Sequence, residues 1–482
     1  MKRKVLILKI LLKCVLAAAL FACTWNFLTP YFRESRSKEG DSFHNLPADS
    51  IDVLALGSSH IQYAFNPGVF YAETGDYSYV LGSQCQPMSM SFYMLEEALK
   101  TQHPSVVIID VFTLLNQSAI CYSEGMYYLA IQQMTGNTRR QAAAELSDGE
   151  TRLSYQYDFL MNHSNWKTMD WSDWKSILAR GRARSGLLSD LGYVRQEPVS
   201  DVHTPLSVPQ ADGSGSLSEQ SRGDLDRIIS LCQDSGIHLI FIKTPYTIDQ
   251  ADANQLAAVW DYLDSRNVEH IDFIAKAAEL NWFSDLDGDT WHNNSWGSEI
   301  VTRYLAKTIT EEGLIRNHQE NETVEAQLRK SVSADAASLM NAHNIDVYSM
   351  LTFAAKYPCT VAVRYSGKKT TSITSVENLM LQAAGLNHDF VKDCAEDYYA
   401  LIQDGKVVKE SDEPFETSLN GTDIAVAADS ITINGSPQGA AGEMELCFCS
   451  DDFSWHNPIS IDYSSRYFWK NGCSGWDCGA GS

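Results

Sequence analysis

The sequence predicts an α/β protein whose main domain has a parallel sheet with helices on both faces. Short apolar runs rich in Val and Ile recur in the first half of the chain, and each ends at a glycine, an acidic residue or a Thr-Pro pair. Such runs are typical of strands that are buried on both faces. Amphipathic helical patterns separate them, which indicates right-handed crossovers into a parallel three-layer α/β/α sheet domain. From residue 346 onward, short strands with tight turns predict a second, smaller β-rich α+β domain.

Four segments of the main domain have the pattern of buried strands: 51–56, 77–81, 105–110 and 238–243. Helical patterns over 91–101 and 225–232 lie between them. The carboxyl ends of parallel strands meet at one edge of the sheet, and folds of this kind bind their ligands there. Functional residues are therefore expected directly after these strands.

The first residues predict a single membrane anchor. Met1 to Lys4 is basic, and residues 5–32 are apolar apart from two lysines and a few small polar residues. A basic leader before an apolar stretch marks an exported chain whose basic end stays in the cytoplasm. No A-x-A cleavage site follows, so we expect an uncleaved transmembrane helix within 1–33 and a single-pass protein of the cell membrane. A lipoprotein box at Leu20–Cys23 and a helix buried in a soluble protein are the alternatives.

Charge and composition limit the possible partners. The 482 residues suggest two or three domains. Lys and Arg number 37 and Asp and Glu number 61, so the formal net charge is −24. A chain this acidic repels phosphate backbones, and nucleic acid is therefore not an expected partner.

The same patterns divide the chain into segments. They are an anchor over 1–33, a tether over 34–50, the α/β domain over 51–315, a linker over 316–345 and the β-rich domain over 346–482. A helical insertion is expected over 118–201, with Trp166, Trp171 and Trp174 near His163. These aromatic residues suit either a lid over a substrate or ordinary buried packing.

Two short motifs far apart in the chain form the candidate active site. The G-S-S-H motif of 57–60 follows the first predicted strand, where a glycine-permitted turn lifts a serine toward solvent. The D-x-x-H motif of 289–292 precedes the last helix of the same domain. A serine hydroxyl needs a base, and a histidine held in one tautomer by a carboxylate can supply it. The motifs therefore predict a nucleophilic serine in the turn of 57–60, His292 as base and Asp289 as the residue that orients His292.

Each motif also has a structural explanation. A G-S-S-H turn can simply join a strand to a helix, and D-x-x-H occurs by chance in many chains. His60 adjoins Ser59 and is an alternative base, but an adjacent residue on a tight turn usually points elsewhere. The order of the motifs favours the catalytic interpretation, since the serine follows the first strand and the Asp–His pair precedes the last helix.

Residues 51 to about 312 resemble the SGNH/GDSL hydrolase superfamily. The resemblance is to its membrane-anchored cell-envelope branch, which includes proteins similar to the D-alanyl transfer protein of teichoic acid modification. That branch often has G-S-S in place of G-D-S, so the resemblance implies a nucleophile at Ser59 and the closing pair at Asp289 and His292. The family's second-block glycine falls on Gly82, and the resemblance implies an oxyanion hole made by the N–H groups of Ser59 and Gly82. The third block, G-x-N-D, is absent after the strand over 105–110, and the asparagine donor is unassigned.

The C-terminal part, from about residue 346 to 471, resembles the ILEI/PANDER-like domain. The resembling stretches are Tyr398–Val408, Ile431–Gly435 and Gly442–Leu446. In this setting the resemblance implies glycan binding or substrate positioning, and a spacer is the alternative.

These observations predict a membrane-anchored, extracytoplasmic serine esterase or O-acyltransferase. The expected partners are an acylated surface polysaccharide or cell-wall polymer and a membrane-bound O-acyltransferase. No cofactor is expected, and no metal site, because no His/Asp cluster has ligand spacing. The alternative is a non-catalytic scaffold of the same fold that binds glycan or a membrane acyltransferase, an interpretation favoured by the missing asparagine.

Overall fold

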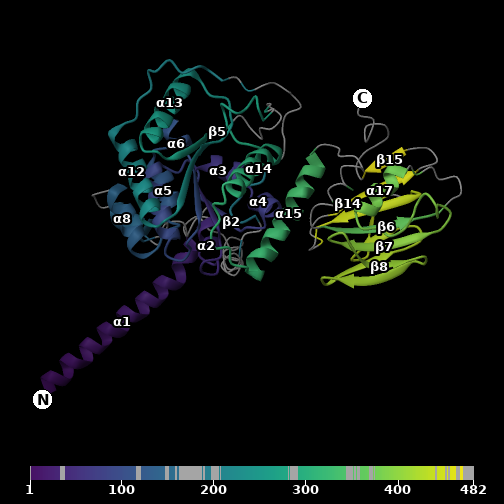
Figure 1. The fold of residues 1–482 in the computed structure, drawn as a ribbon. Helices are drawn as coiled ribbons and strands as arrows, with labels where there is room; N and C mark the ends of the chain where they lie inside the picture. The colour runs from purple at the N-terminus through teal and green to yellow at the C-terminus, as the bar shows by residue number, and fades with distance from the viewer. Residues whose placement is uncertain are drawn as a thin grey trace.

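The computed structural model describes residues 2–32, 38–115, 121–146, 151–157, 160–161, 187, 190–196, 206, 208–280, 282, 291–342, 351, 354, 359–367, 373, 375–439, 442–450, 453, 456–462 and 467–470. Figure 1 shows an α/β domain, a C-terminal β-rich domain and an N-terminal helix that extends away from both.

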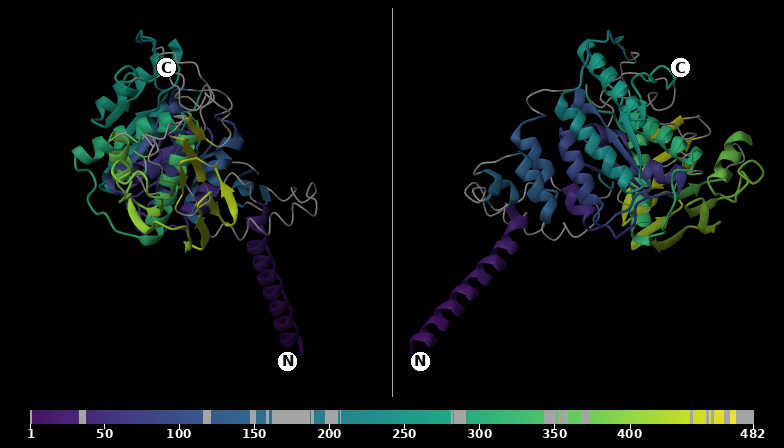
Figure 2. Two further views of the ribbon diagram at one scale, coloured as in Figure 1. Left: turned by 90° about the vertical axis from the view of Figure 1, so that its right-hand side faces the viewer. Right: turned by 60° about the vertical axis from the view of Figure 1, so that its left-hand side comes forward.

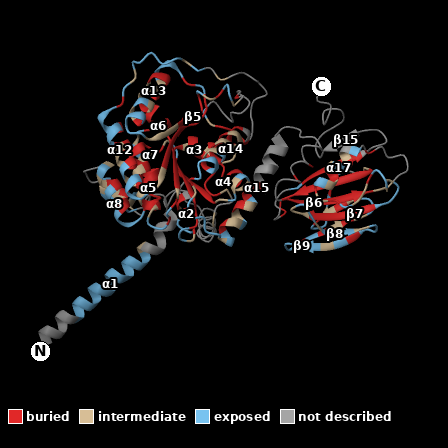
Figure 3. Ribbon diagram, viewed as in Figure 1, coloured by how far each residue is buried: buried red, intermediate tan, exposed pale blue. Residues whose placement is uncertain are grey.

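The α/β domain is built on a parallel sheet, as predicted. Within the described residues five strands lie in the order β2-β1-β3-β4-β5. They are β1 (Val53–Gly57), β2 (Ser78–Gly82), β3 (Val106–Asp110), β4 (His238–Lys243) and β5 (Glu269–Asp272). β1 pairs in parallel with both β2 and β3, and its last residue, Gly57, lies opposite Gly82. The strands β1, β2 and β3 are buried throughout, which explains their continuous apolar runs. In Figure 3 the strands at the centre of the α/β domain have the colour of buried residues.

Helices cover both faces of this sheet. Alternate residues of a strand point to opposite faces, so Leu54 and Leu56 join one core and Val53 and Ala55 the other. The helices of the first core are α5 (Met88–Ala98), α12 (Glu219–Asp234) and α13 (Gln250–Ser265). Those of the second core are α3 (Ser59–Ala64), α4 (Pro67–Thr74) and α14 (Ser295–Glu311). The three layers bring the ends of β1 and β3 and the loop before α14 to one edge of the domain.

The segments predicted as a tether and as an insertion contain further helices. The tether includes α2 (Lys38–Phe43), and its Phe43 ring packs 5.2 Å from the ring of Tyr79. In the insertion, the described helices are α7 (Glu124–Ile131), α8 (Gly136–Leu146) and α9 (Thr151–Gln156), and α7 and α8 contact α5. The cluster of Trp166, Trp171 and Trp174 near His163 lies outside the described residues.

The predicted linker over 316–345 contains a long helix, α15 (Glu322–Ala342). Its first turns belong to the α/β domain: Val324 and Leu328 are buried in the first core, and Glu325 accepts a hydrogen bond of 2.8 Å from the hydroxyl of Tyr71 on α4. Arg329, one turn later, forms an ion pair with Asp404 of the β-rich domain. The predicted linker is therefore helical over much of its length despite its polar composition. This helix is apolar on one side and contacts both domains.

The β-rich domain contains two antiparallel sheets among its described residues. The larger has the order β15-β14-β13-β6-β7-β8 and the smaller β12-β11-β10-β9. The strands of the larger sheet are β6 (Thr360–Tyr365), β7 (Tyr398–Gln403), β8 (Lys406–Ser411), β13 (Met444–Cys449), β14 (His456–Asp462) and β15 (Tyr467–Lys470). Those of the smaller sheet are β9 (Phe415–Leu419), β10 (Thr422–Val426), β11 (Ile431–Ile433) and β12 (Ser436–Gln438).

One face of the larger sheet packs against α17 (Ser375–Ala383), through Leu381 of the helix and Val363 of β6. The other face packs against the smaller sheet, through Leu401 of β7 and Ile424 of β10. The predicted hairpin turn at Asp404 and Gly405 has φ angles of 52° and 68°, which suit a D-G turn.

The N-terminal residues form α1 (Lys2–Phe32), which projects from the α/β domain in every view (Figures 1 and 2). Ile10, Leu16, Leu20 and Phe21 are exposed on it. In the part of the chain that the structure describes, no helix has both the length and the apolar character that a membrane crossing requires.

Candidate active site

The candidate nucleophile lies on a tight connection between β1 and α3. Gly57 ends β1 with a φ of +143°, a conformation that residues with a Cβ rarely adopt. Ser58 caps α3, and its hydroxyl accepts a hydrogen bond of 3.3 Å from the backbone N–H of His60. Ser59 is therefore the first residue of α3, at the carboxyl edge of the sheet, and it is partly exposed.

His292 lies next to this serine. Its Nε2 is 2.8 Å from Ser59 Oγ, although the two residues are 233 positions apart in the chain. The loop that carries His292 is anchored by its neighbour, because the Asn293 side chain donates a hydrogen bond of 2.9 Å to the carbonyl of Pro245. A nucleophile and a base in direct hydrogen-bond contact are the geometry that serine catalysis requires.

The predicted third member of this site, Asp289, lies outside the described residues. Its role as the residue that orients His292 stays a prediction. The imidazole is also held by packing, since the ring of Tyr63 lies 4.5 Å from it, centroid to centroid.

The structure brings Gly82 to the same edge of the sheet. A Cβ on Gly82 would lie 2.7 Å from the carbonyl oxygen of Gly57 and 3.0 Å from Cγ of Gln62, so only glycine fits here without a shift of the backbone. The next residue, Ser83, donates its N–H to that Gly57 carbonyl at 3.3 Å. β2 thus ends against the turn that carries Ser59. The assignment of the Gly82 N–H to an oxyanion hole stays a prediction.

The segment after β3, where the family's third block is expected, has a different structure. Asp110 ends β3, and its carboxylate accepts hydrogen bonds from the backbone N–H of Phe112 at 2.9 Å and of Thr244 at 3.0 Å. Phe112 then begins α6 (Phe112–Leu115). The carboxylate ties the ends of β3 and β4 together and, among the described residues, no asparagine follows in this segment.

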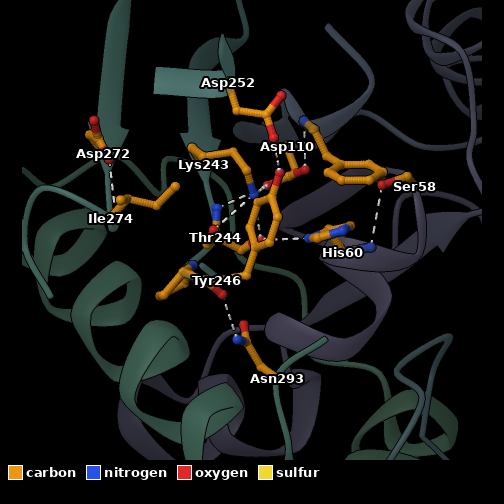
Figure 4. Close-up of polar contacts among 12 residues, drawn as sticks. Ser58, His60, Asp110, Lys243, Thr244, Tyr246, Asp252, Asp272, Ile274 and Asn293 are labelled. Carbon is orange, nitrogen blue, oxygen red and sulfur yellow. Dashed lines mark hydrogen bonds and ion pairs between the residues drawn. The ribbon is translucent and has the colours of Figure 1, made fainter. Parts of the chain in front are cut away.

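A buried polar cluster that the sequence patterns did not predict lies next to His292. It contains His60, Asp110, Lys243, Thr244 and Tyr246, which Figure 4 shows as sticks. Lys243, at the end of β4, is completely buried and lies 3.7 Å from Asp110. Its ammonium group donates hydrogen bonds to the carbonyl and hydroxyl oxygens of Thr244 and lies 4.5 Å from the ring centroid of Tyr246. Burial lowers the pKa of Lys243, while Asp110, Asp272 and Asp252 counteract that effect. The only sequence signal is a lysine at the end of an otherwise apolar run.

His60, the base that sequence analysis disfavoured, belongs to this cluster. Its ring is stacked on Phe112 with 3.7 Å between centroids and lies 5.2 Å from the ring of His292. Its Nδ1 lies 3.4 Å from the hydroxyl of Thr244. Burial, followed by the charges of Lys243 and His292, lowers the pKa of His60 well below its ordinary value of 6.5. His60 is therefore neutral at pH 7.

Two groups of potential metal ligands lie at the opposite edge of the sheet. One consists of Asp52, Asp76 and His318, and the other of His238, Glu269 and Glu312. In each group a histidine nitrogen is already hydrogen-bonded to a carboxylate, at 2.8 Å for His318 and Asp52 and at 2.6 Å for His238 and Glu269. Spacing in the sequence does not show these groups because only the fold brings their members together.

No family model matches the chain, and no curated protein matches it. Similar solved structures include a protein of Desulfitobacterium hafniense DCB-2 that is named for the G-D-S-L family of lipolytic proteins. It is 11% identical, the match covers 53% of this chain and 97% of that chain, and the TM-score is 0.25. Another, from Bacteroides fragilis NCTC 9343, is named as an acylhydrolase. It is 10% identical, the match covers 58% of this chain and 99% of that chain, and the TM-score is 0.29. Similarities this low carry no weight for the fold or the function of this chain, which rest on its own geometry.

Proposed function

We propose that this protein is a serine esterase or O-acyltransferase that works through an acyl-serine intermediate. The observation that carries the proposal is the 2.8 Å contact between Ser59 Oγ and His292 Nε2 at the carboxyl edge of a parallel sheet. Ser59 has the turn that an exposed nucleophile needs, and His292 is the base within reach of its proton.

The reaction proceeds in two steps. Ser59 Oγ attacks the carbonyl carbon of an acyl ester while its proton passes to His292 Nε2. The tetrahedral intermediate then expels the alcohol, which takes that proton and leaves the acyl group on Ser59. In the second step, water or the hydroxyl of an acceptor gives its proton to His292 and attacks the carbonyl carbon of the acyl-serine. The bond to Ser59 Oγ then breaks and His292 returns the proton to that oxygen, which releases the acid or the new ester and restores the free serine.

Backbone N–H groups of Ser59 and Gly82 are proposed to stabilise the oxyanion of both tetrahedral intermediates, and Asp289 to orient His292. Removal of one oxyanion donor typically lowers kcat by about 10²–10³-fold. Hydrolysis and transfer share the acyl-serine and differ only in the acceptor that reaches it.

For the location, we propose a single-pass protein of the cell membrane, anchored within residues 1–33, with its other domains outside the cytoplasm. The described part of α1 is not by itself long and apolar enough to cross a membrane, so this proposal rests on the sequence pattern of residues 1–33. The basic residues at the start of α1 and the exposed apolar side chains along it support this proposal. This proposal is tested by fractionating cells that express the full-length chain or a variant lacking residues 2–32. We expect the full-length chain in the membrane fraction and the variant in the soluble fraction. Recovery of both in the soluble fraction would contradict anchoring.

The proposed substrate is an O-acylated surface polysaccharide or cell-wall polymer, within the SGNH-type cell-envelope branch described above. A membrane-bound O-acyltransferase is the proposed protein partner. The β-rich domain, in its proposed ILEI/PANDER-like role, would position the polymer for the α/β domain. The net charge of −24 is compatible with a sugar partner and disfavours nucleic acid.

The proposal is tested by steady-state hydrolysis of p-nitrophenyl acetate by the full-length chain. We expect turnover that is lost in Ser59→Ala and in His292→Ala. Ser265→Ala and His103→Ala are matched controls, since both side chains are exposed and neither lies at this site. Full activity in Ser59→Ala would refute the proposal, and no activity in the parent chain would favour the scaffold alternative.

A further inference from the structure

The imidazole of His60 is enclosed on several sides, beside the imidazole of His292. It stacks on Phe112, and the ring of Tyr246 lies 5.0 Å away, centroid to centroid. His60 is only 3% exposed, and its remaining ring neighbour is His292, which contacts Ser59. A ring held this closely has one fixed orientation, and what it does there depends on which nitrogen carries the proton.

A chain of hydrogen bonds assigns that proton. The ammonium group of Lys243 can only donate, so Thr244 Oγ1 accepts from it at 3.2 Å. Thr244 Oγ1 also lies 3.4 Å from His60 Nδ1, and among the described residues this nitrogen is the acceptor available for its hydroxyl proton. With Nδ1 as the acceptor, the proton of the neutral ring is on Nε2.

The groups that form this series of hydrogen bonds are themselves held in place. Asp110 accepts hydrogen bonds from the backbone N–H groups of Thr244 and Phe112, and therefore positions two of the residues that contact the His60 ring. It also lies 3.7 Å from Lys243, whose charge disfavours protonation of His60. Asp252, which accepts a hydrogen bond of 3.2 Å from Tyr246, completes the charged surroundings. The cluster thus maintains a neutral imidazole with an Nε2–H group.

Phe112 begins the segment after β3, in which the sequence has no G-x-N-D motif and the described residues 111–115 include no asparagine. We propose, on the basis of the proposed function, that the Nε2–H of His60 is the side-chain donor to the oxyanion in place of the asparagine of that motif. A neutral imidazole can act in this way because it donates a hydrogen bond without giving up its proton. Lys243 and Thr244 are positioning residues, which polarise the ring and fix its tautomer.

The first test compares two substitutions of His60 in the full-length chain. His60→Leu removes the donor and keeps an apolar side chain against Phe112, and we expect kcat for p-nitrophenyl acetate to fall by about 10²–10³-fold with KM little changed. His60→Asn keeps an N–H donor, and we expect it to recover at least a tenth of the parent kcat. Thermal unfolding of both variants separates loss of folding from loss of the donor. A folded His60→Leu variant with the parent's kcat would overturn the proposal.

The second test reads the tautomer and does not depend on activity. In ¹⁵N-histidine-labelled protein, the long-range ¹H–¹⁵N spectrum is expected to show His60, assigned with His60→Gln, as the neutral Nε2–H tautomer at pH 7. Thr244→Val removes the hydroxyl and is expected to give a mixture of tautomers and about a tenfold lower kcat, whereas Thr244→Ser keeps the parent values. A pure Nδ1–H tautomer in the parent would overturn the assignment.

The two proposals fail in different ways. If the parent chain forms no acyl adduct on Ser59, both the proposed function and the proposed role of His60 are refuted. If Ser59 is acylated at the same rate in the parent chain and in His60→Leu, only the proposed role of His60 is refuted.

Discussion

Gly82→Ala tests whether the close contact between the ends of β1 and β2 positions the active site. The added Cβ would lie 2.7 Å from the carbonyl oxygen of Gly57, which is backbone and cannot rotate away. Atoms in contact lie about 3.5–4.0 Å apart, so the two strand ends must separate by roughly 0.8 Å or more. Overpacking of this kind costs about 1–3 kcal/mol in the free energy of unfolding.

This cost predicts a decrease in the midpoint of thermal unfolding of about 2–12 °C for a domain of this size. The same displacement moves Ser59 relative to His292 and shifts the proposed Gly82 donor. A misplacement of about 1 Å can lower the rate 10²-fold, so we expect kcat/KM for p-nitrophenyl acetate to fall by about 10–100-fold.

The matched control is Gly223→Ala, in the exposed part of α12, where a Cβ meets nothing within 4 Å. It is expected to stabilise the fold by about 0.5–1 kcal/mol, since alanine favours a helix over glycine, and to leave activity unchanged. If Gly82→Ala unfolded at the parent's temperature and kept the parent's kcat/KM, the argument for a required glycine would be wrong.

Two further predictions concern stability. Leu328 of α15 is buried in a core of the α/β domain, so Leu328→Ala is expected to lower the free energy of unfolding by about 2–5 kcal/mol in urea titrations; a change below 0.5 kcal/mol would show that α15 is not part of that domain. In the β-rich domain, burial raises the pKa of Glu445 to about 7 despite the neighbouring Arg364. The folded state then keeps a proton that the unfolded state loses near pH 4.3. The free energy of unfolding therefore decreases as the pH rises from about 4.5 to 7. Glu445→Gln is expected to remove this slope from urea titrations repeated across that range, and an unchanged slope would contradict the buried position of the carboxyl group.

The sequence patterns predict the strands that have strong apolar runs and miss the weak one. The runs ending near Gly57, Gly82 and Asp110 are buried on both faces and become β1, β2 and β3. β5 has only four residues, and Glu269 and His270 make up half of it, so no apolar run marks it. The helix α15 was missed for a similar reason, since the apolar positions 324 and 328 lie among charged residues.

The candidate site shows the same division. A glycine turn after a strand and a histidine before a helix are local patterns, so Ser59 and His292 can be chosen from the sequence alone. The packing of His60, Lys243 and Thr244 depends on the sheet order, which brings β4 beside β3. No spacing along the chain predicts that a lysine at the end of a strand will be fully buried, because its burial is compensated by Asp110 from another strand.

The acyl-serine intermediate is tested most directly by the intact mass of the full-length chain after exposure to p-nitrophenyl acetate, with Ser59→Ala measured in parallel. The account predicts a mass increase of one acetyl group on the parent chain, located on the peptide that contains Ser59, and no increase on the variant. An equal adduct on both chains, or none on the parent while the ester is still consumed, would contradict Ser59 as the nucleophile.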